Sequence, residues 1–266
     1  MDKQKLKEEV KFYWNQASCG TEFIDKPKFS RDYFEAIEEY RYMREPEIFA
    51  FAQFTRFHKQ KVLEVGIGAG SDFIQWVRAG AIAYGIDLTP EAIENVQQRL
   101  QLYDLKAQEL LVADAEQLPY PDNFFDIVYS WGVIHHSPDT RQCLSEIVRV
   151  TRPGGTIKIM IYNRNSLFAF YRYLAHGLMK ARPFRSRKSI LFRHQESPGT
   201  KAYTFDEARE LFAQFPVSIT SIAAPATQHD LLTYKTWPFR LAAYILASIF
   251  GWHRVGWFMV IEAKKE

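Results

Sequence analysis

The sequence is poor in cysteine and in long apolar runs, and each shortage excludes a class of protein. Cys19 and Cys143 are the only cysteines among 266 residues, so no disulfide framework can form and a reducing compartment is expected. The longest apolar run, Leu241–Trp252, has twelve residues including Ser248, whereas a membrane-spanning helix needs about 20. The first nine residues are too charged for a signal peptide. We therefore expect a cytoplasmic protein whose contact with a membrane, if any, is peripheral.

Strong net charge is also lacking. The chain has 34 Lys and Arg against 31 Asp and Glu, and the resulting charge of +3 does not by itself imply a nucleic-acid partner. With 47% hydrophobic residues, the chain is long enough to bury one substantial core. We expect a single elaborated domain.

The most informative stretch is a short apolar run that breaks into alternating glycines. Lys61–Val65 is predicted to be a buried strand and Gly66–Gly70 a tight turn, and the apolar spacing from Ser71 onward is typical of a helix. Such a strand–turn–helix exposes backbone N–H groups above the strand end. Glycines suit this turn because a Cβ would block the close approach of a ligand. The stretch predicts a nucleotide-like ligand.

Two acidic residues sharpen this prediction. Asp87 ends the next predicted strand, nineteen residues after Gly68, where a carboxylate can accept hydrogen bonds from both hydroxyls of a ribose. Asp114 ends the third strand. Dinucleotide dehydrogenases carry G-x-G-x-x-G, but the pattern here is E-x-G-x-G-x-G, beginning at Glu64. The spacing and Asp114 therefore argue against a nicotinamide-dependent dehydrogenase.

From about Lys61 to Asn163 the chain resembles class I S-adenosylmethionine-dependent methyltransferases of the UbiE-like, small-molecule type. The pieces that match, in the family's order, are Val62–Gly70, Tyr84–Leu88, Ala113–Pro119, Phe124–Val128, His135–His136 and Arg149–Gly155. The match covers a little over a third of the chain. It implies a doubly wound, mainly parallel seven-stranded α/β sheet with a terminal antiparallel strand pair. It also implies S-adenosyl-L-methionine as the cofactor.

The resemblance assigns a role to each cofactor residue. The glycines approach the methionine part of the donor, Asp87 takes the ribose, and Asp114 with Ala115 takes the adenine. Glu64 either contacts the ligand or orients the glycine loop. The full set of expected cofactor-binding residues is Glu64, Gly66, Gly68, Gly70, Asp87, Leu88, Asp114, Ala115 and Trp131.

Regular elements are expected to alternate through this region. Strands are predicted at Lys61–Val65, Ala83–Leu88, Leu110–Asp114, Phe125–Trp131, Thr156–Tyr162, Val217–Ile222 and Gly256–Ala263. Helices are predicted at Ser71–Ala79, Pro90–Leu102, Thr140–Val150, Phe205–Phe215 and Leu241–Phe250. Residues 1–60 are expected to form an N-terminal helical lid, and residues 61–266 the methyltransferase domain, with insertions at about 163–203 and 224–255. Within the lid, Tyr13, Arg41 and Tyr42 are candidate contacts to donor or substrate, although core packing and surface pairing explain them equally well.

Methyl transfer from a sulfonium needs the nucleophile and the methyl carbon held in line, about 3–3.5 Å apart and away from water. It requires no covalent catalyst and no metal, and we expect no metal site because the other histidines are scattered. The candidate catalytic residues are His135, His136 and Tyr162. A histidine could take a proton from the nucleophile, and His135 is favoured because adjacent turn residues seldom both face one cavity. Each candidate also has a structural interpretation, as a turn histidine bonded to backbone or as packing.

The acceptor is left open by the motifs. From Asn163 to Gln195 there are eight bases and no acid. These bases are Arg164, Arg172, Lys180, Arg182, Arg185, Arg187, Lys188 and Arg193. Interleaved apolar residues favour an anionic membrane surface, contacted through 164–193 and 237–252, or an anionic, lipid-like acceptor methylated on O, N or C. A solvated basic face is the simpler interpretation. RNA methylation through 164–193 remains an alternative, disfavoured by the lack of Asn-Pro-Pro-Tyr after the fourth strand, and so does a non-catalytic donor-binding subunit.

Overall fold

The computed structural model describes residues 2–16, 18, 20–176, 191–192, 196–233 and 235–266. Cys19 and six of the eight bases noted above, from Lys180 to Arg193, lie outside these ranges. The helices are α1 (Lys3–Gln16), α2 (Arg31–Arg44), α3 (Glu47–Ala52), α4 (Ser71–Arg78), α5 (Pro90–Leu102), α6 (Thr140–Val150), α7 (Leu167–His176), α9 (Phe205–Phe212) and α10 (Trp237–Phe250), with 3₁₀ turns η1 (Thr21–Phe23) and η2 (Phe54–Phe57). The strands are β1 (Lys61–Val65), β2 (Ile82–Asp87), β3 (Glu109–Val112), β4 (Phe125–Trp131), β5 (Thr151–Tyr162), β6 (Val217–Ala223) and β7 (Phe258–Lys265).

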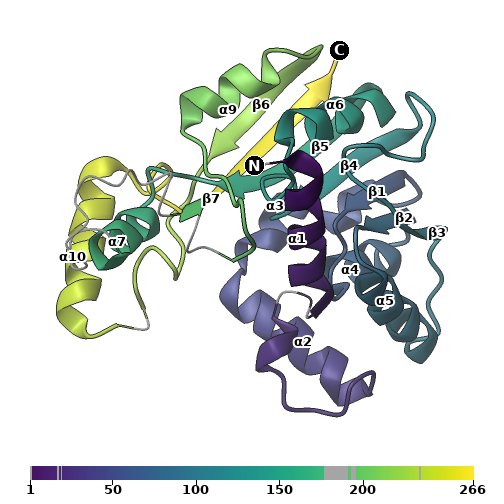
Figure 1. Ribbon diagram of the computed structural model, residues 1–266, viewed down its shortest axis with the longest axis horizontal. Helices are drawn as coiled ribbons and strands as arrows, with labels where there is room; N and C mark the ends of the chain where they lie inside the picture. Colours follow the sequence, from purple (N-terminus) through teal and green to yellow (C-terminus); the bar gives the residue numbers. More distant parts are fainter. Residues whose placement is uncertain (1, 17, 19, 177–190, 193–195, 234) are drawn as a thin grey trace.

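The strands form one seven-stranded sheet in the order β3-β2-β1-β4-β5-β7-β6 (Figure 1). β1 lies in the middle and pairs in parallel with β2 and with β4. β7 runs antiparallel between β5 and β6. This topology confirms the predicted doubly wound sheet and its terminal antiparallel pair. The strand order reverses beside β1, and that reversal creates the crevice in which open α/β sheets bind ligands.

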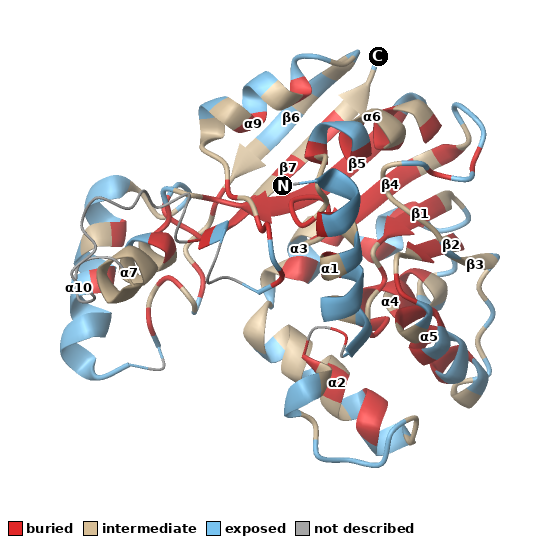
Figure 2. Cartoon of the chain, in the orientation of Figure 1, coloured by how far each residue is buried: buried red, intermediate tan, exposed pale blue. Residues whose placement is uncertain are grey.

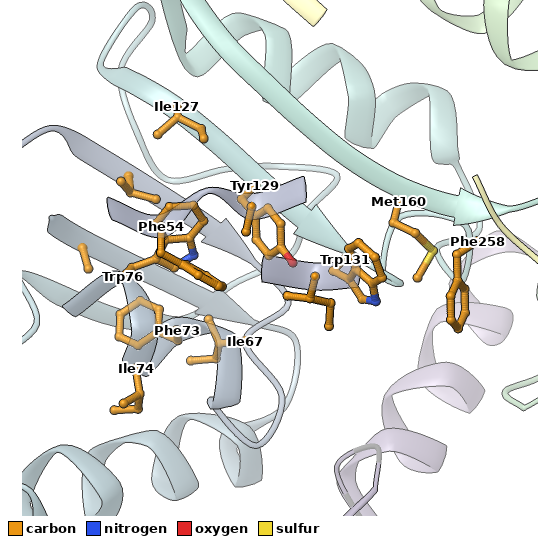
Figure 3. Packing of buried hydrophobic residues seen from close by; sticks show 14 of the residues in the cluster. Phe54, Ile67, Phe73, Ile74, Trp76, Ile127, Tyr129, Trp131, Met160 and Phe258 are labelled. Carbon is orange, nitrogen blue, oxygen red and sulfur yellow. The ribbon is translucent and has the colours of Figure 1, made fainter. Parts of the chain in front are cut away.

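Successive side chains along each strand point to opposite faces of the sheet, so the hydrophobic core is divided between the two faces. Val62 and Ile127 point to the face covered by α4 and α5, where Trp76 packs edge-on against Phe54 and Tyr129 (Figure 3). Leu63 and Val128 point to the other face, which is covered by α6 and α9. Both faces of β1 are therefore buried, as expected for a central parallel strand.

Side-chain caps fix the starts of the helices that follow the strands. The Thr89 hydroxyl accepts a hydrogen bond from Ala92 N–H at the start of α5, and Pro90 takes the first helical position. Thr204 and Glu207 form a capping box at the start of α9. The Thr89 cap thus starts α5 immediately after Asp87, the carboxylate predicted to bind the ribose.

Several predicted boundaries shift. β3 ends at Val112 rather than Asp114, because Asp114 turns away from the sheet and its side chain accepts a hydrogen bond from Glu116 N–H. β5 begins at Thr151, directly after α6, rather than at Thr156, so Pro153 and Gly154 lie within the strand. α9 ends at Phe212, and β7 runs from Phe258 to Lys265.

The two insertions place α7 and α10 together in a lobe beyond β7, away from the helices that cover the parallel strands (Figure 1). The lobe rests on the sheet through Phe168, whose ring lies 5.2 Å from that of Trp257. Trp257 in turn stacks on Tyr162 at the end of β5, at 4.2 Å. The lobe is therefore anchored beside the carboxyl ends of the parallel strands.

Candidate functional site

A cavity lies at the carboxyl ends of β1, β2 and β4. Its wall includes every residue that the sequence predicts for the cofactor: Glu64, Gly66, Gly68, Gly70, Asp87, Leu88, Asp114, Ala115 and Trp131. Three separate segments of the chain, which follow β1, β2 and β3, are thus brought to one place by the parallel pairing of the strands.

The glycine turn has a backbone that other residues would distort. Gly66 has φ of +81°, and a Cβ added there would lie 2.2 Å from the Val133 side chain. Gly68 also has positive φ, but no atom lies within 4 Å of its would-be Cβ. Gly66 therefore serves packing against the loop after β4, while Gly68 leaves its backbone open to a ligand.

Asp87 holds this turn in place. Its Oδ2 accepts a hydrogen bond from Gly68 N–H at 3.0 Å, and its Oδ1 accepts from Thr89 N–H and the Thr89 hydroxyl. Burial raises the pKa of Asp87, although these hydrogen bonds oppose the shift. A carboxylate has about four acceptor sites. Three are occupied here, so Oδ2 keeps one lone pair for a donor such as a sugar hydroxyl.

Asp114 is engaged by the N-terminal helix. Lys7 of α1 donates to Asp114 Oδ2 at 2.6 Å and to Glu116 Oε2 at 2.5 Å, with its side chain mostly buried. Nearer the start of α1, Lys3 pairs with Asp139 at 2.7 Å. Three ion pairs, made by two lysines, therefore hold α1 against the segments that follow β3 and β4.

Charged groups form another part of the wall, and two tyrosines outside the wall donate hydrogen bonds to them. Arg41 of α2 faces Asp72 of α4, with Nη2 at 2.9 Å from Oδ2 and Nε at 3.4 Å from Oδ1. The hydroxyls of Tyr42 and Tyr129 donate to the same carboxylate, at 3.2 and 3.0 Å. The predicted contact Arg41 thus lines the cavity in a buried ion pair, while Tyr42 supports that pair from behind.

Glu64 lies beside these charged groups and is only 3% exposed. Its Oε2 has no hydrogen-bond partner among the described residues. Burial, followed by the nearby Asp72 carboxylate, raises the pKa of Glu64 well above its ordinary value. A buried carboxyl oxygen without a hydrogen-bond partner is a site where a cationic group of a ligand would be stabilised.

The two histidines have different surroundings. His136 lines the cavity, whereas His135 and Tyr162 do not. His135 is fully buried, and burial lowers its pKa well below the ordinary value. Its ring packs 4.0 Å from that of Tyr162. The structure therefore brings His136 to the cavity wall, instead of the favoured candidate His135.

Hydrogen bonds fix the His136 ring. The Thr200 hydroxyl donates to the Ser197 carbonyl at 2.7 Å, so its oxygen is left to accept from His136 Nδ1 at 3.0 Å. The Ser197 hydroxyl lies 2.9 Å from the same nitrogen and can donate to it, so Nδ1 has a hydrogen-bond partner in either tautomer of the ring. Nε2 lies 3.4 Å from Glu196 Oε2, which also accepts from the Tyr162 hydroxyl at 2.8 Å. A proton gained by Nε2 would thus face a carboxylate.

Residues of α1 that the motifs did not single out also line the cavity. Lys7, Val10 and Trp14 lie on one side of the helix, and the Trp14 ring meets the His136 ring edge-on at 5.4 Å. Tyr13, a candidate contact, is not part of the wall. The spacing of Lys7, Val10 and Trp14 is the only sequence signal for this face, and any packed helix would show it.

Among the described residues, no group of three His, Cys, Asp or Glu side chains is arranged to hold a metal ion. The cavity instead offers backbone N–H groups, two strand-end carboxylates and a buried guanidinium.

The known proteins to which the chain is similar include several methyltransferases. Residues 63–159 match the family model described as a methyltransferase domain. An uncharacterized protein of Mycobacterium bovis is 34% identical over 145 residues, which are 54% of this chain and 50% of that protein. A demethylmenaquinone methyltransferase of Bacillus mycoides is 30% identical over 146 residues, 49% of this chain and 62% of that protein. The chain spans about half the length of the curated relatives it matches first.

The fold comparison covers more of the chain. The structure of a geranyl diphosphate C-methyltransferase from Streptomyces coelicolor A3(2) superposes with a TM-score of 0.64 over 98% of each chain, at 14% sequence identity. This likeness shows that the chain has the class I methyltransferase fold.

Glu64 gives a prediction that needs no ligand. Its raised pKa means that the folded protein binds the proton more tightly than the unfolded chain, so ionisation of Glu64 costs stability as pH rises above about 4.5. Glu64→Gln removes that cost. We expect the variant to gain unfolding free energy over the wild type at pH 8, where the buried carboxyl resists ionisation, and to gain little at pH 4. Urea unfolding at both pH values measures this. The exposed Glu94→Gln serves as control, and an equal gain at both pH values would contradict the assignment.

Proposed function

Because residues 63–159 form a methyltransferase domain, we propose that the protein transfers the methyl group of S-adenosyl-L-methionine to O, N or C of a small-molecule or lipid-like acceptor. The observation that carries the proposal is the meeting of three strand ends at one cavity, with the glycine turn, Asp87 and Asp114 all in its wall. A dehydrogenase would share the first two features but not the third.

In this proposal the adenosyl group lies between the ends of β2 and β3. The remaining lone pair of Asp87 Oδ2 accepts a ribose hydroxyl, and the second hydroxyl reaches Oδ1 only by competing with Thr89. Asp114 and Ala115 face the adenine edge. Leu88 and Trp131 supply apolar wall. The bare backbone at Gly68 lets the donor approach closely.

The amino-acid end of the donor is a zwitterion, and the charged set of the wall suits both of its charges. Arg41 would hold the carboxylate, while the partnerless oxygen of Glu64 would hold the ammonium. Binding an ammonium would favour the ionised form of Glu64. The donor would then be oriented at both ends, with the sulfonium between them, which is the positioning that methyl transfer requires.

Asp87 is the first test of the donor site. Asp87→Ala removes the acceptor of the ribose hydroxyl and the bond that holds Gly68 in place. We expect S-adenosylhomocysteine, measured by calorimetry, to bind about tenfold to hundredfold more weakly, the effect of losing a hydrogen bond to a charged group. Glu94→Ala, an exposed acid on α5, should bind normally. Normal binding by Asp87→Ala would refute the donor site.

The N-terminal helix would close the site. Lys7, Val10 and Trp14 cover the adenine side, and the Lys7 ion pair with Asp114 and Glu116 holds the helix down. An intact pair therefore slows the exchange of ligand and keeps water out of the reacting centre.

Lys7→Met keeps the apolar stem of the side chain and removes the ion pair. We expect S-adenosylhomocysteine to dissociate about fivefold faster, corresponding to roughly 1 kcal/mol of lost closure. Stopped-flow fluorescence of Trp14 can follow the release. Lys11→Met, on the exposed side of the same helix, should leave the rate unchanged. Equal rates in the two variants would show that the ion pair does not hold α1 closed.

For an acceptor that must lose a proton, His136 is the better placed base. Its imidazole would take the proton from the nucleophile, and Glu196, 3.4 Å from Nε2, would stabilise the imidazolium that forms. Nδ1 stays bonded to Thr200, so the ring does not turn away. The buried, neutral His135 packs behind it.

His136→Asn tests this role. A panel of phenols, amines and isoprenoid alcohols with methyl-labelled donor would first identify an acceptor. We then expect His136→Asn to lower kcat by about a hundredfold or more while donor affinity stays within about twofold. His135→Asn should affect stability more than kcat. The opposite ranking of the two variants would assign the base to His135.

The acceptor class follows from the compounds that the relatives are named for. The named relatives and the solved structure have small or isoprenoid compounds in their names. A donor-binding subunit without activity predicts donor binding but no label transfer to any member of the panel, so the same assay distinguishes it.

A further inference from the structure

α10 presents its large apolar side chains to solvent. Trp237, Leu241, Ile245 and Ile249 are 72%, 51%, 51% and 67% exposed. They are spaced four residues apart, so they form one ridge along the helix. We call these four residues the outer ridge. Most of α10 is exposed in Figure 2.

The inner side of α10 is made of small residues. Ala243 and Ala247 are its buried positions and lie on the side opposite the outer ridge. A surface helix of a globular protein has the reverse arrangement, with bulky apolar groups inward. An exposed apolar ridge of this length marks an interaction site.

The charge around the outer ridge identifies the kind of partner. Residues 231–261 contain no Asp or Glu, and neither do residues 163–195, of which Leu167–His176 form α7 in the same lobe. At the average acid content of this chain, these two segments together would hold roughly seven acids. Exposed bases flank the ridge instead, including Arg240 within α10 and Arg254 after it.

We propose that the outer ridge and its flanking bases form a peripheral docking site for an anionic lipid bilayer. α10 would lie in the plane of the interface, with the ridge among the acyl chains and the bases at the headgroups. Trp237 and Tyr244 have the amphipathic rings that favour the interface. No helix in the described ranges is long and apolar enough to cross a membrane, so the contact is a surface one.

A second copy of this chain fits the ridge less well than a bilayer does. A symmetric dimer would bring the same acid-free surfaces together, and their like charges would repel. An anionic surface complements both the apolar ridge and the bases. The lobe also meets the sheet at Trp257 and Tyr162, beside the His136 network, so a docked lobe would hold the acceptor side of the cavity close to the membrane.

Vesicle sedimentation tests the proposal with the full chain and without any acceptor. We expect binding to vesicles of phosphatidylcholine with a quarter phosphatidylglycerol to be at least tenfold stronger than binding to pure phosphatidylcholine at about 0.1 M salt, and to weaken as salt is raised. Leu241→Ser/Ile245→Ser should lower the partition coefficient at least tenfold. The matched control Phe23→Ser/Met43→Ser removes exposed apolar groups elsewhere and should bind like the wild type.

Charge is tested in the same way. Lys235→Glu/Arg240→Glu should abolish the preference for anionic vesicles, whereas Lys106→Glu/Arg141→Glu, with the same change in net charge on exposed residues elsewhere, should retain it. S-adenosylhomocysteine affinity measured on every variant confirms folding and separates this proposal from the proposed activity, because vesicle binding requires no donor. The proposal would be overturned if Leu241→Ser/Ile245→Ser bound vesicles as strongly as the wild type. It would also be overturned if the protein bound no vesicles but self-associated, and Leu241→Ser/Ile245→Ser abolished that self-association. Salt-sensitive binding to RNA without binding to vesicles would overturn it as well.

Discussion

The hydrogen bond from Gly68 N–H to Asp87 Oδ2 joins two segments that the rest of the site depends on. Gly68 belongs to the turn after β1 and Asp87 to the end of β2, and the parallel pairing of these strands brings the two within 3.0 Å. Because the bond uses only one lone pair of Oδ2, the same carboxylate can fix the turn and still meet a ligand. The glycine turn leads directly into α4, and Asp72 in the first turn of α4 lies in the charged part of the wall. The Asp87 carboxylate that holds the turn in place is therefore also the group proposed to bind the ligand.

Closure of the cavity relies on electrostatics between elements far apart in sequence. α1 is held by Lys3 and Lys7, and α2 by Arg41, each against carboxylates that follow or flank the parallel strands. The acids at the strand ends pair with the cations of the covering helices, and under the proposed function the same acids would also meet the ligand. The lid and the ligand thus compete for the same groups. This competition gives the covering helices a reason to move when the ligand binds.

The parts of this site that could be predicted are those encoded by contiguous residues. The glycine turn and Asp87 follow their strands directly, so the motif and the alternation of elements were enough to locate them. Asp114 was found as well, although the strand before it is shorter than predicted. The choice between His135 and His136 could not be made in this way. It depends on which ring faces the cavity, and that is set by Thr200, Ser197 and Glu196, some sixty residues later in the chain. The same holds for Lys7 and Trp14, whose role depends on where α1 docks.

The distribution of charge separates the two ends of the molecule. Acids gather at the carboxyl ends of the parallel strands, where they hold the covering helices and surround the cavity. The lobe of α7 and α10 lies next to that cavity through Trp257 and Tyr162, yet the segments that build it have bases and almost no acids. Solubility does not require this separation, since mixed charges serve it equally well. The proposed donor site and the proposed membrane contact would each benefit from it, because a zwitterionic donor and an anionic bilayer would then each meet a surface of complementary charge.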